Sequence, residues 1–104
     1  MPDDMIIRFW GVRGSHPVPG PRTVRVGGNT ACVEIQAGPH TVILDAGTGI
    51  INLGADLVRR SHANGGHPIV ATILFSHMHN DHTQGFPFFD PAYAGASTLH
   101  ILGP

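Results

Sequence analysis

Apolar residues occur along the chain in short runs and alternations that predict strands, with one stretch of helical spacing between them. Runs of about four to eight residues that are rich in β-branched and aromatic side chains are typical of strands. By this criterion the sequence predicts strands over residues 5–10, 31–36, 41–45, 69–75 and 98–102. Because these strands are interrupted by a helix, we expect an α/β fold with a mixed sheet.

The stretch of helical spacing lies between the third and fourth strands. Apolar residues recur there on one face of a helix: Ile50, Leu53, Leu57 and Val58. This spacing predicts a helix over about residues 48–62, with Gly54 allowing the helix to approach the sheet closely. Strand, helix and strand in this order form a βαβ unit. Strands 41–45 and 69–75 should therefore be parallel and end at the same edge of the sheet.

The strand at residues 31–36 alternates between an apolar and a more polar face. Ala31, Val33 and Ile35 share one face, and Cys32, Glu34 and Gln36 share the other. We expect the face that carries Glu34 to be the wetter one. Cys32 is interpreted as a packed small residue, because the sequence shows none of the electropositive surroundings that make a thiol reactive.

The strongest chemical signal follows the apolar strand at residues 69–75. His77, His79, Asp81 and His82 lie within six residues, in the sequence HMHNDH. Imidazoles suit zinc and similar transition metals, and a carboxylate adds an oxygen ligand and negative charge. The alternative is a solvated polar loop that arose in a histidine-rich chain. The density of ligand types at the end of a strand favours a metal site.

Asp45 ends the preceding strand and is followed by two glycines, in the sequence LDAGTGI. A carboxylate in this position points into the crevice where α/β proteins bind ligands. It could equally cap the helix that follows, since Asp before a helix accepts backbone N–H bonds. The residues alone leave both interpretations open.

Residues 11–30 are dense in Gly and Pro and predict a long irregular loop. Four arginines and no acidic residue lie between Met5 and Val33: Arg8, Arg13, Arg22 and Arg25. Arginine matches phosphate oxygens well, so Arg13, Arg22 and Arg25 are candidates for substrate contact. The alternative is that they are solvated loop arginines.

Composition limits the remaining possibilities. A chain of 104 residues fits one domain, and its net charge of −1 does not predict nucleic-acid binding. With a single cysteine, Cys32, it has no internal disulfide, which fits a reducing compartment. The sequence shows no signal peptide and no apolar run near the roughly 20 residues that a membrane helix needs. We therefore expect a cytoplasmic protein without a membrane partner.

The metal-ligating stretch also carries a family resemblance. Residues 75–89, FSHMHNDHTQGFPFF, resemble the signature loop of metallo-β-lactamase-fold hydrolases. The pattern Asp-His-x-x-Gly-x-Pro is similar to the ribonuclease Z and phosphodiesterase branch, whereas the x-Gly-Gly that follows Asp-His in the lactamase and glyoxalase II branches is absent. Residues 11–35 resemble the N-terminal region of the same branch, where the loop lies near the active-site cleft.

The resemblance implies an incomplete site. In such a family His77 and His79 would hold one metal, and Asp81 and His82 a second. Asp45 would support this site by hydrogen bonding to a ligand histidine or its loop. The remaining ligands come from later in such chains. Residues 1–104 are therefore expected to form the N-terminal half of an αββα sandwich, a partial domain whose C-terminal half is absent.

The resemblance also implies an activity, namely hydrolysis of a small-molecule or nucleotide phosphodiester by a metal-bound hydroxide. Two zinc ions would serve the complete domain, with manganese or iron as alternatives, and Asp81 would be catalytic by orienting the hydroxide. We expect the isolated chain to be inactive, and a homo-oligomer is a further expectation. The alternatives are a thioester or lactone hydrolase of the same fold, and a non-catalytic metal-binding fragment. A redox diiron protein is disfavoured, because Glu typically stands where this chain has His79.

Overall fold

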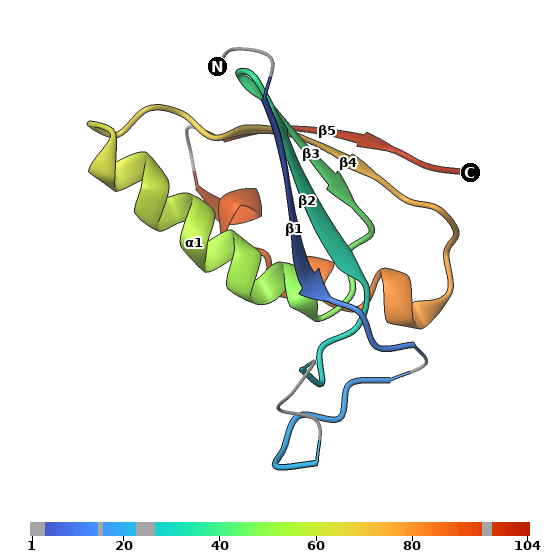
Figure 1. Ribbon diagram of the computed structural model, residues 1–104. Helices are drawn as coiled ribbons and strands as arrows, with labels where there is room; N and C mark the ends of the chain where they lie inside the picture. Colours follow the sequence, from blue (N-terminus) through green and yellow to red (C-terminus); the bar gives the residue numbers. More distant parts are fainter. Residues whose placement is uncertain (1–3, 15, 23–26, 95–96) are drawn as a thin grey trace.

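The computed structural model describes residues 4–14, 16–22, 27–94 and 97–104. Within them the chain forms a five-stranded mixed sheet with a helix packed on one face (Figure 1). The strands are β1 (Met5–Gly11), β2 (Cys32–Ala37), β3 (His40–Leu44), β4 (Val70–Leu74) and β5 (Thr98–Leu102). Helix α1 spans Gly49–Ala63, and three short 3₁₀ helices follow β4: η1 (Asn80–His82), η2 (Phe86–Phe88) and η3 (Asp90–Tyr93).

The α/β class, the five strands and the helix are all confirmed, with ends that differ from the expected ones by one residue at most. The strands lie in the sheet in sequence order. The pairs β1–β2 and β2–β3 are antiparallel, whereas the pairs β3–β4 and β4–β5 are parallel. Since β3 and β4 flank α1 and are parallel, the expected βαβ unit is present. No helix in the described part of the chain is both long and apolar enough to cross a membrane.

Both crossover connections lie on the same face of the sheet. Helix α1 joins β3 to β4, and the segment that contains η1, η2 and η3 joins β4 to β5. Since η2 and η3 contact α1, this second connection lies beside the helix (Figure 1). We call this side the covered face, and the opposite side, which carries no such layer among the described residues, the open face.

The core lies between the sheet and α1. Ile43 of β3 and Ile73 of β4 are fully buried against the helix, which contributes Ile50 and Leu53. Full burial of each such side chain contributes about 1.5–3 kcal/mol. Phe89, which follows η2, is also fully buried and closes the core from the side of the second crossover.

Gly54 permits a close approach, but to a different partner from the one expected. A Cβ atom at this position would lie 2.8 Å from Cδ1 of Phe89 and 3.0 Å from Cδ of Pro91. The prediction that Gly54 faces the sheet is therefore wrong. Gly54 lies instead on the side of the helix that packs against the segment after η2, which belongs to the second crossover.

The expected orientation of β2 is also wrong. Cys32 and Glu34 are fully buried on the covered face, whereas Val33 and Ile35 are only half-buried on the open face. The prediction that Cys32 is a packed residue is confirmed, and burial raises the pKa of its thiol to about 12. The error concerns Glu34, whose burial depends on partners that are distant in the sequence.

Three side chains donate four hydrogen bonds to the buried carboxylate of Glu34. Arg60 donates to both of its oxygens, at 2.6 and 3.1 Å, and Trp10 Nε1 and Gln36 Nε2 donate at 2.9 and 2.8 Å. Burial alone would raise the pKa of Glu34, but these donors, Arg60 above all, lower it from 4.5 to about 2. Since a buried charge is tolerated when it is paired and hydrogen-bonded, a polar residue can occupy the covered face.

The open face is largely apolar and accessible, and its polar residues in the described strands are His40, Thr72, Thr98 and His100. By strand register its side chains come from alternate residues of every strand, among them Met5, Ile7, Phe9, Val33, Ile35, Val42, Leu44, Val70, Leu74 and Leu102. Phe9 is 70% exposed and Val70 54% exposed. Monomeric soluble proteins seldom expose so many large apolar side chains on one face. The open face therefore has the composition of an interface.

Candidate metal centre

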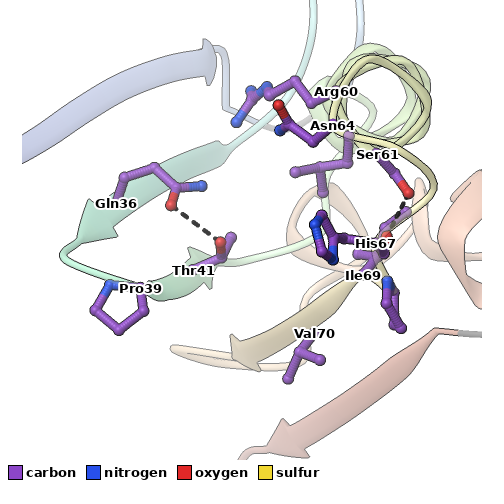
Figure 2. Close-up of a pocket in the computed structure, with 11 residues that line it drawn as sticks. Gln36, Pro39, Thr41, Arg60, Ser61, Asn64, His67, Ile69 and Val70 are labelled. Carbon is purple, nitrogen blue, oxygen red and sulfur yellow. Dashed lines mark hydrogen bonds between the residues drawn. The ribbon is translucent and has the colours of Figure 1, made fainter.

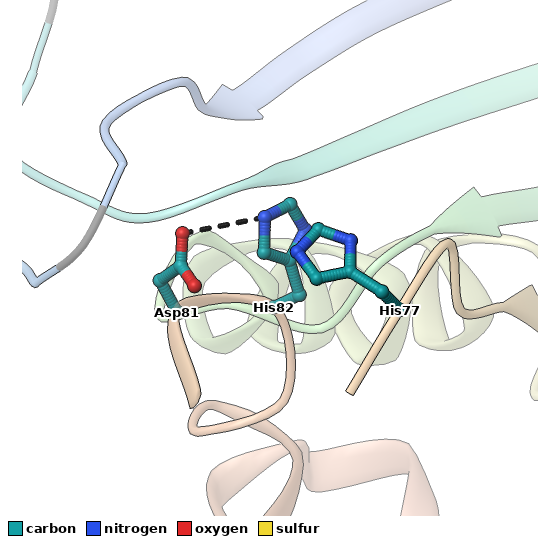
Figure 3. A group of neighbouring side chains, drawn as sticks. All are labelled: His77, Asp81 and His82. Atoms are coloured by element: carbon teal, nitrogen blue, oxygen red, sulfur yellow. Dashed lines mark ion pairs between the residues drawn. The ribbon is translucent and has the colours of Figure 1, made fainter. Parts of the chain in front are cut away.

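Three of the four predicted metal ligands converge just beyond the carboxyl end of β4. One possible ligand atom from each of His77, Asp81 and His82 lies within 4.8 Å of the others. Figure 3 shows the three side chains grouped together. His77 comes from the extended loop after β4, and Asp81 and His82 come from η1. All three side chains are half-buried, so they are accessible from solvent yet held by their surroundings.

The spacing of Asp81 and His82 fits one metal ion. Oδ2 of Asp81 lies 3.3 Å from Nε2 of His82. Two ligand atoms bound about 2.0–2.1 Å from a tetrahedral zinc ion are separated by about 3.3 Å. Because a carboxylate oxygen and an imidazole nitrogen are both ordinary zinc ligands, this pair of atoms suits such an ion without rearrangement.

His79 lies beside this group and is not part of it. Its ring is exposed and makes an edge contact with the ring of His77, with 4.6 Å between the ring centroids. The backbone of His79 is extended, immediately before the first turn of η1. The structure thus places His79 next to His77, the residue with which it was predicted to share a metal.

Asp45 lies behind the group, and its carboxylate faces the metal-ligating loop. Oδ1 accepts a hydrogen bond from the backbone N–H of Ser76 at 2.8 Å, and Oδ2 accepts one from the Ser76 hydroxyl at 2.7 Å. Oδ2 also lies 2.9 Å from Nδ1 of His82. Burial would raise the pKa of Asp45, but Ser76 and then His82 lower it below its usual value. Asp45 is therefore an ionised acceptor.

The hydrogen bonds separate the two interpretations of Asp45. The start of α1 is bonded by Thr30 instead: its Oγ1 accepts from the N–H of the N-cap residue Thr48 at 2.8 Å, and its carbonyl accepts from the N–H of Gly49 at 3.2 Å. The carboxylate of Asp45 is directed to the loop after β4. Its geometry agrees with the supporting role implied by the resemblance, and its effect on metal binding remains a prediction.

Backbone contacts fix the ligand loop against the turn after β3. The N–H of Ala46 donates to the carbonyl of His82 at 2.7 Å, and the N–H of Gly85 donates to the carbonyl of Ala46 at 2.9 Å. A Cβ atom at Gly47 would lie 2.4 Å from the carbonyl oxygen of Asp81, and one at Gly85 would lie 2.1 Å from the carbonyl oxygen of Gly47. Only glycine permits this approach of the two backbones.

Two side chains of the site region were missed by sequence reasoning. Gln84 Nε2 donates to Oγ1 of Thr30 at 3.1 Å, which ties the end of the long loop to the ligand loop. Ser76 binds Asp45, as described above. Neither residue carries a signal of its own in the sequence, although Ser76 directly precedes the first ligand and could have been considered for that reason.

For Arg13 and Arg22, the two of the three candidate loop arginines that the structure describes, no hydrogen bond or ion pair to the metal-ligating group is found. Arg13 Nε donates to the carbonyl of His16 at 2.9 Å, within its own loop. Arg22 is exposed, and Arg25 lies outside the described residues. For Arg13 and Arg22 the described contacts agree with loop arginines, and a role in substrate binding stays a prediction.

A cavity lies at the C-terminal end of α1, away from the metal-ligating group. It has a volume of about 600 Å³ and is lined by the last turns of the helix and by residues of β2, β3 and β4 (Figure 2). The guanidinium of Arg60 at its wall is already bonded to Glu34 and to Asp56. This cavity is therefore separate from the metal-ligating group and offers no free cation from Arg60.

Comparison with known proteins adds little to this geometry. No protein-family model matches the chain, and no curated protein matches it. One solved structure with a likeness is described as a "putative metallo-beta-lactamase" from Thermotoga maritima. It is 20% identical, covers 91% of this chain with a TM-score of 0.45, and is itself covered over 42% of its length. With a TM-score below 0.5, this likeness supports no conclusion about the family of this chain.

Proposed function

We propose that this chain is part of a metal-dependent hydrolase of the metallo-β-lactamase fold that cleaves phosphodiesters. The observation that carries the proposal is the convergence of His77, Asp81 and His82 at the carboxyl edge of the sheet, with Asp45 hydrogen-bonded behind His82. The preference for phosphodiesters is supported only by the Asp-His-x-x-Gly-x-Pro pattern that begins at Asp81.

The residues present would divide between two ions. Asp81 and His82 have the spacing of two ligands of one ion, and His77 and His79 lie together as candidates for a second. Zinc is the first expectation, with manganese or iron as alternatives. When bound, a pair of such ions activates water and stabilises the attacking and leaving oxygens of an in-line displacement. Asp81 would position the reacting groups as a ligand, while Asp45 would orient His82.

The open face supports the proposal that residues 1–104 are part of a larger domain. In an αββα sandwich a second sheet packs on such a face and buries its apolar side chains. A second copy of the chain is the alternative occupant, which would make the protein a homo-oligomer. Sedimentation of the chain alone and of a longer protein distinguishes the two, because only the longer protein would be monomeric if its own residues cover the face.

The activity is tested with the longest form of the protein that carries downstream residues. An activated phosphodiester, an activated thioester and a β-lactam are assayed side by side with and without zinc. We expect zinc-dependent turnover of the phosphodiester to be the fastest, and Asp81→Asn to abolish most of it. Faster turnover of the thioester or the β-lactam would refute the phosphodiesterase assignment while leaving a hydrolase of this fold.

The second candidate function is metal binding without catalysis by the 104-residue chain. It is favoured by one observation: His77, Asp81 and His82 are the only ligand group found among the described residues. A catalytic dinuclear centre needs about six ligands, so the chain alone is expected to bind about one zinc ion weakly. Elemental analysis of the purified chain gives the stoichiometry. Two tightly bound ions with turnover equal to that of the longer protein would show that the chain is catalytically complete.

A further inference from the structure

The carboxylate of Asp45 is linked to a second ligand histidine through a serine hydroxyl. Oγ of Ser76 lies 2.7 Å from Oδ2 of Asp45 and 3.1 Å from Nδ1 of His77. The same Oδ2 atom lies 2.9 Å from Nδ1 of His82. One carboxylate oxygen is thus connected to His82 directly and to His77 through a single intervening hydroxyl.

The direction of each hydrogen bond follows from the chemistry of the groups. An ionised carboxylate can only accept, and a serine hydroxyl has one hydrogen to donate. The hydrogen of Ser76 is therefore used by Asp45, and Ser76 Oγ can only accept from the Nδ1–H of His77. Asp45 likewise accepts from the Nδ1–H of His82. Both histidines then carry their hydrogen on Nδ1 and leave the lone pair of Nε2 free.

The free nitrogens are on the side where a metal would bind. Nε2 of His82 faces Oδ2 of Asp81 at 3.3 Å. Figure 3 shows one ring nitrogen of His77 directed toward His82 and the other directed away from it. Ser76 is bonded to Nδ1 of His77, which leaves Nε2 available to a metal. The tautomer set by Ser76 is the one whose Nε2 lone pair is free to bind that metal.

We propose that Ser76 is a positioning residue that extends the orienting effect of Asp45 to His77. It fixes the neutral tautomer and the ring orientation of His77 before any metal binds. The inference rests on the proposed function only in taking His77 as a metal ligand. It goes beyond that proposal by naming how the first ligand of the loop is prepared for a divalent transition metal.

The backbone at Asp45 indicates that this arrangement is held firmly. Asp45 has a φ of 66°, in the left-handed region that non-glycine residues seldom adopt. Its own N–H donates to the carbonyl of Leu74 at 2.9 Å, so both its backbone and its carboxylate are tied to the end of β4. The carboxylate keeps the backbone N–H of Ser76 as a donor when the serine side chain is changed. Substitution of Ser76 should therefore leave Asp45 and His82 in place.

The first test is the tautomer of His77 in the metal-free 104-residue chain. Nitrogen-15 chemical shifts of the ring, recorded at alkaline pH, distinguish Nδ1–H from Nε2–H. We expect Nδ1–H for His77 and His82 in the parent chain. In Ser76→Ala we expect His77 to change toward a mixture of tautomers while His82 stays unchanged, and in Ser76→Thr both should match the parent. Nε2–H at His77 in the parent chain would overturn the proposal without any variant.

The second test is zinc affinity, measured by competition with a chromophoric chelator. Loss of a hydrogen-bond partner of a metal ligand typically weakens metal binding by about 10–100-fold, and we expect this for Ser76→Ala. Ser76→Thr should stay close to the parent, since it keeps the hydroxyl. Ser61→Ala is the matched control, because Ser61 Oγ donates to the carbonyl of His67 at the other end of α1.

The outcomes separate this inference from the proposed function. Unchanged zinc affinity in Ser76→Ala, or an unchanged His77 tautomer, refutes the role of Ser76 and leaves the hydrolase proposal intact. A parent chain that binds no zinc refutes the metal site, while the tautomer measurement still decides whether Ser76 orients His77.

Discussion

The two faces of the sheet contrast in a way that reverses the usual expectation. The covered face buries a charged group, Glu34, beside aliphatic residues such as Ile43 and Ile73. The open face has no Asp, Glu, Lys or Arg among its described strand residues, yet Phe9 and Val70 on it are largely exposed. Burial here is decided by whether a layer is present to supply packing and partners. The polarity of the side chains alone does not decide it.

The largest effect is expected from removing the partner of the buried charge. Arg60 is 32% exposed and Glu34 is 0% exposed, so Arg60→Ala leaves a desolvated carboxylate without its main donor. Loss of one member of a buried pair costs about 3–5 kcal/mol, and the partial exposure of Arg60 places this case near about 3 kcal/mol. Urea unfolding of the chain measures the change.

The neighbouring arginine is the matched control for that measurement. Arg59 is on the same helix, is 72% exposed and pairs only with Asp56 among the described contacts. Arg59→Ala should change the free energy of unfolding by no more than about 0.5 kcal/mol. Equal effects at Arg59 and Arg60 would mean that Glu34 does not depend on its partner, and the contrast between the faces would lose its explanation.

A substitution of Asp45 tests whether this buried carboxylate contributes to metal binding or only to the stability of the fold. Asp45→Asn keeps the size of the side chain but removes the ionised acceptor that holds Ser76 and His82. We expect metal affinity to fall by about 10–100-fold while the fold survives. Zinc competition and circular dichroism measure the two quantities. Unaltered zinc affinity with a lowered Tm would show that Asp45 is structural only.

A smaller effect is expected from neutralising Glu34 itself. Glu34→Gln keeps the size of the side chain, loses the charge and replaces one accepting oxygen by an NH₂ group that cannot accept, which should cost about 1–2 kcal/mol near neutral pH. Because the folded-state pKa of Glu34 lies near 2, below its value of 4.5 when unperturbed, its ionisation stabilises the fold above about pH 4.5. That contribution is lost as the pH falls toward 2. The variant and the parent should therefore converge in stability across this window, and a constant gap would contradict the assigned pKa.

The smallest effect on folding is expected on the open face. Phe9→Lys should change the free energy of unfolding by about 0.5 kcal/mol or less, because Phe9 is 70% exposed. The same change should reduce self-association of the chain, since a charge would interrupt the apolar surface. Sedimentation and urea unfolding measure both. A loss of stability comparable to that of Arg60→Ala would mean that the open face is packed within this chain.

The fold was largely predictable because its signals are local. The run at residues 69–75 and the helical spacing of Ile50, Leu53 and Leu57 each specify an element without reference to the rest of the chain. The convergence of His77, Asp81 and His82 was predictable for the same reason, since they are close in sequence and follow a strand end, and their role as metal ligands stays a prediction.

The errors and omissions all involve partners that are distant in the sequence. The orientation of β2 depends on Arg60, which is 26 residues from Glu34, and the partner of Gly54 depends on where the second crossover packs. Ser76 becomes informative only when Asp45, 31 residues away, is seen beside it. Such contacts arise from the topology, and no periodicity in the sequence records them.

The backbone attachment of the ligand loop has an evolutionary consequence. His82 is anchored through its carbonyl to the N–H of Ala46, and the loop is closed by the N–H of Gly85. Met78, by contrast, is 60% exposed between the first two histidines. Hydrogen bonds between backbone groups do not depend on the identity of the side chains. Exposed positions such as Met78 can therefore change without displacing His77, Asp81 and His82. If the proposed metal site is correct, single substitutions in the loop can thus change its surface while the proposed metal ligands stay where they are.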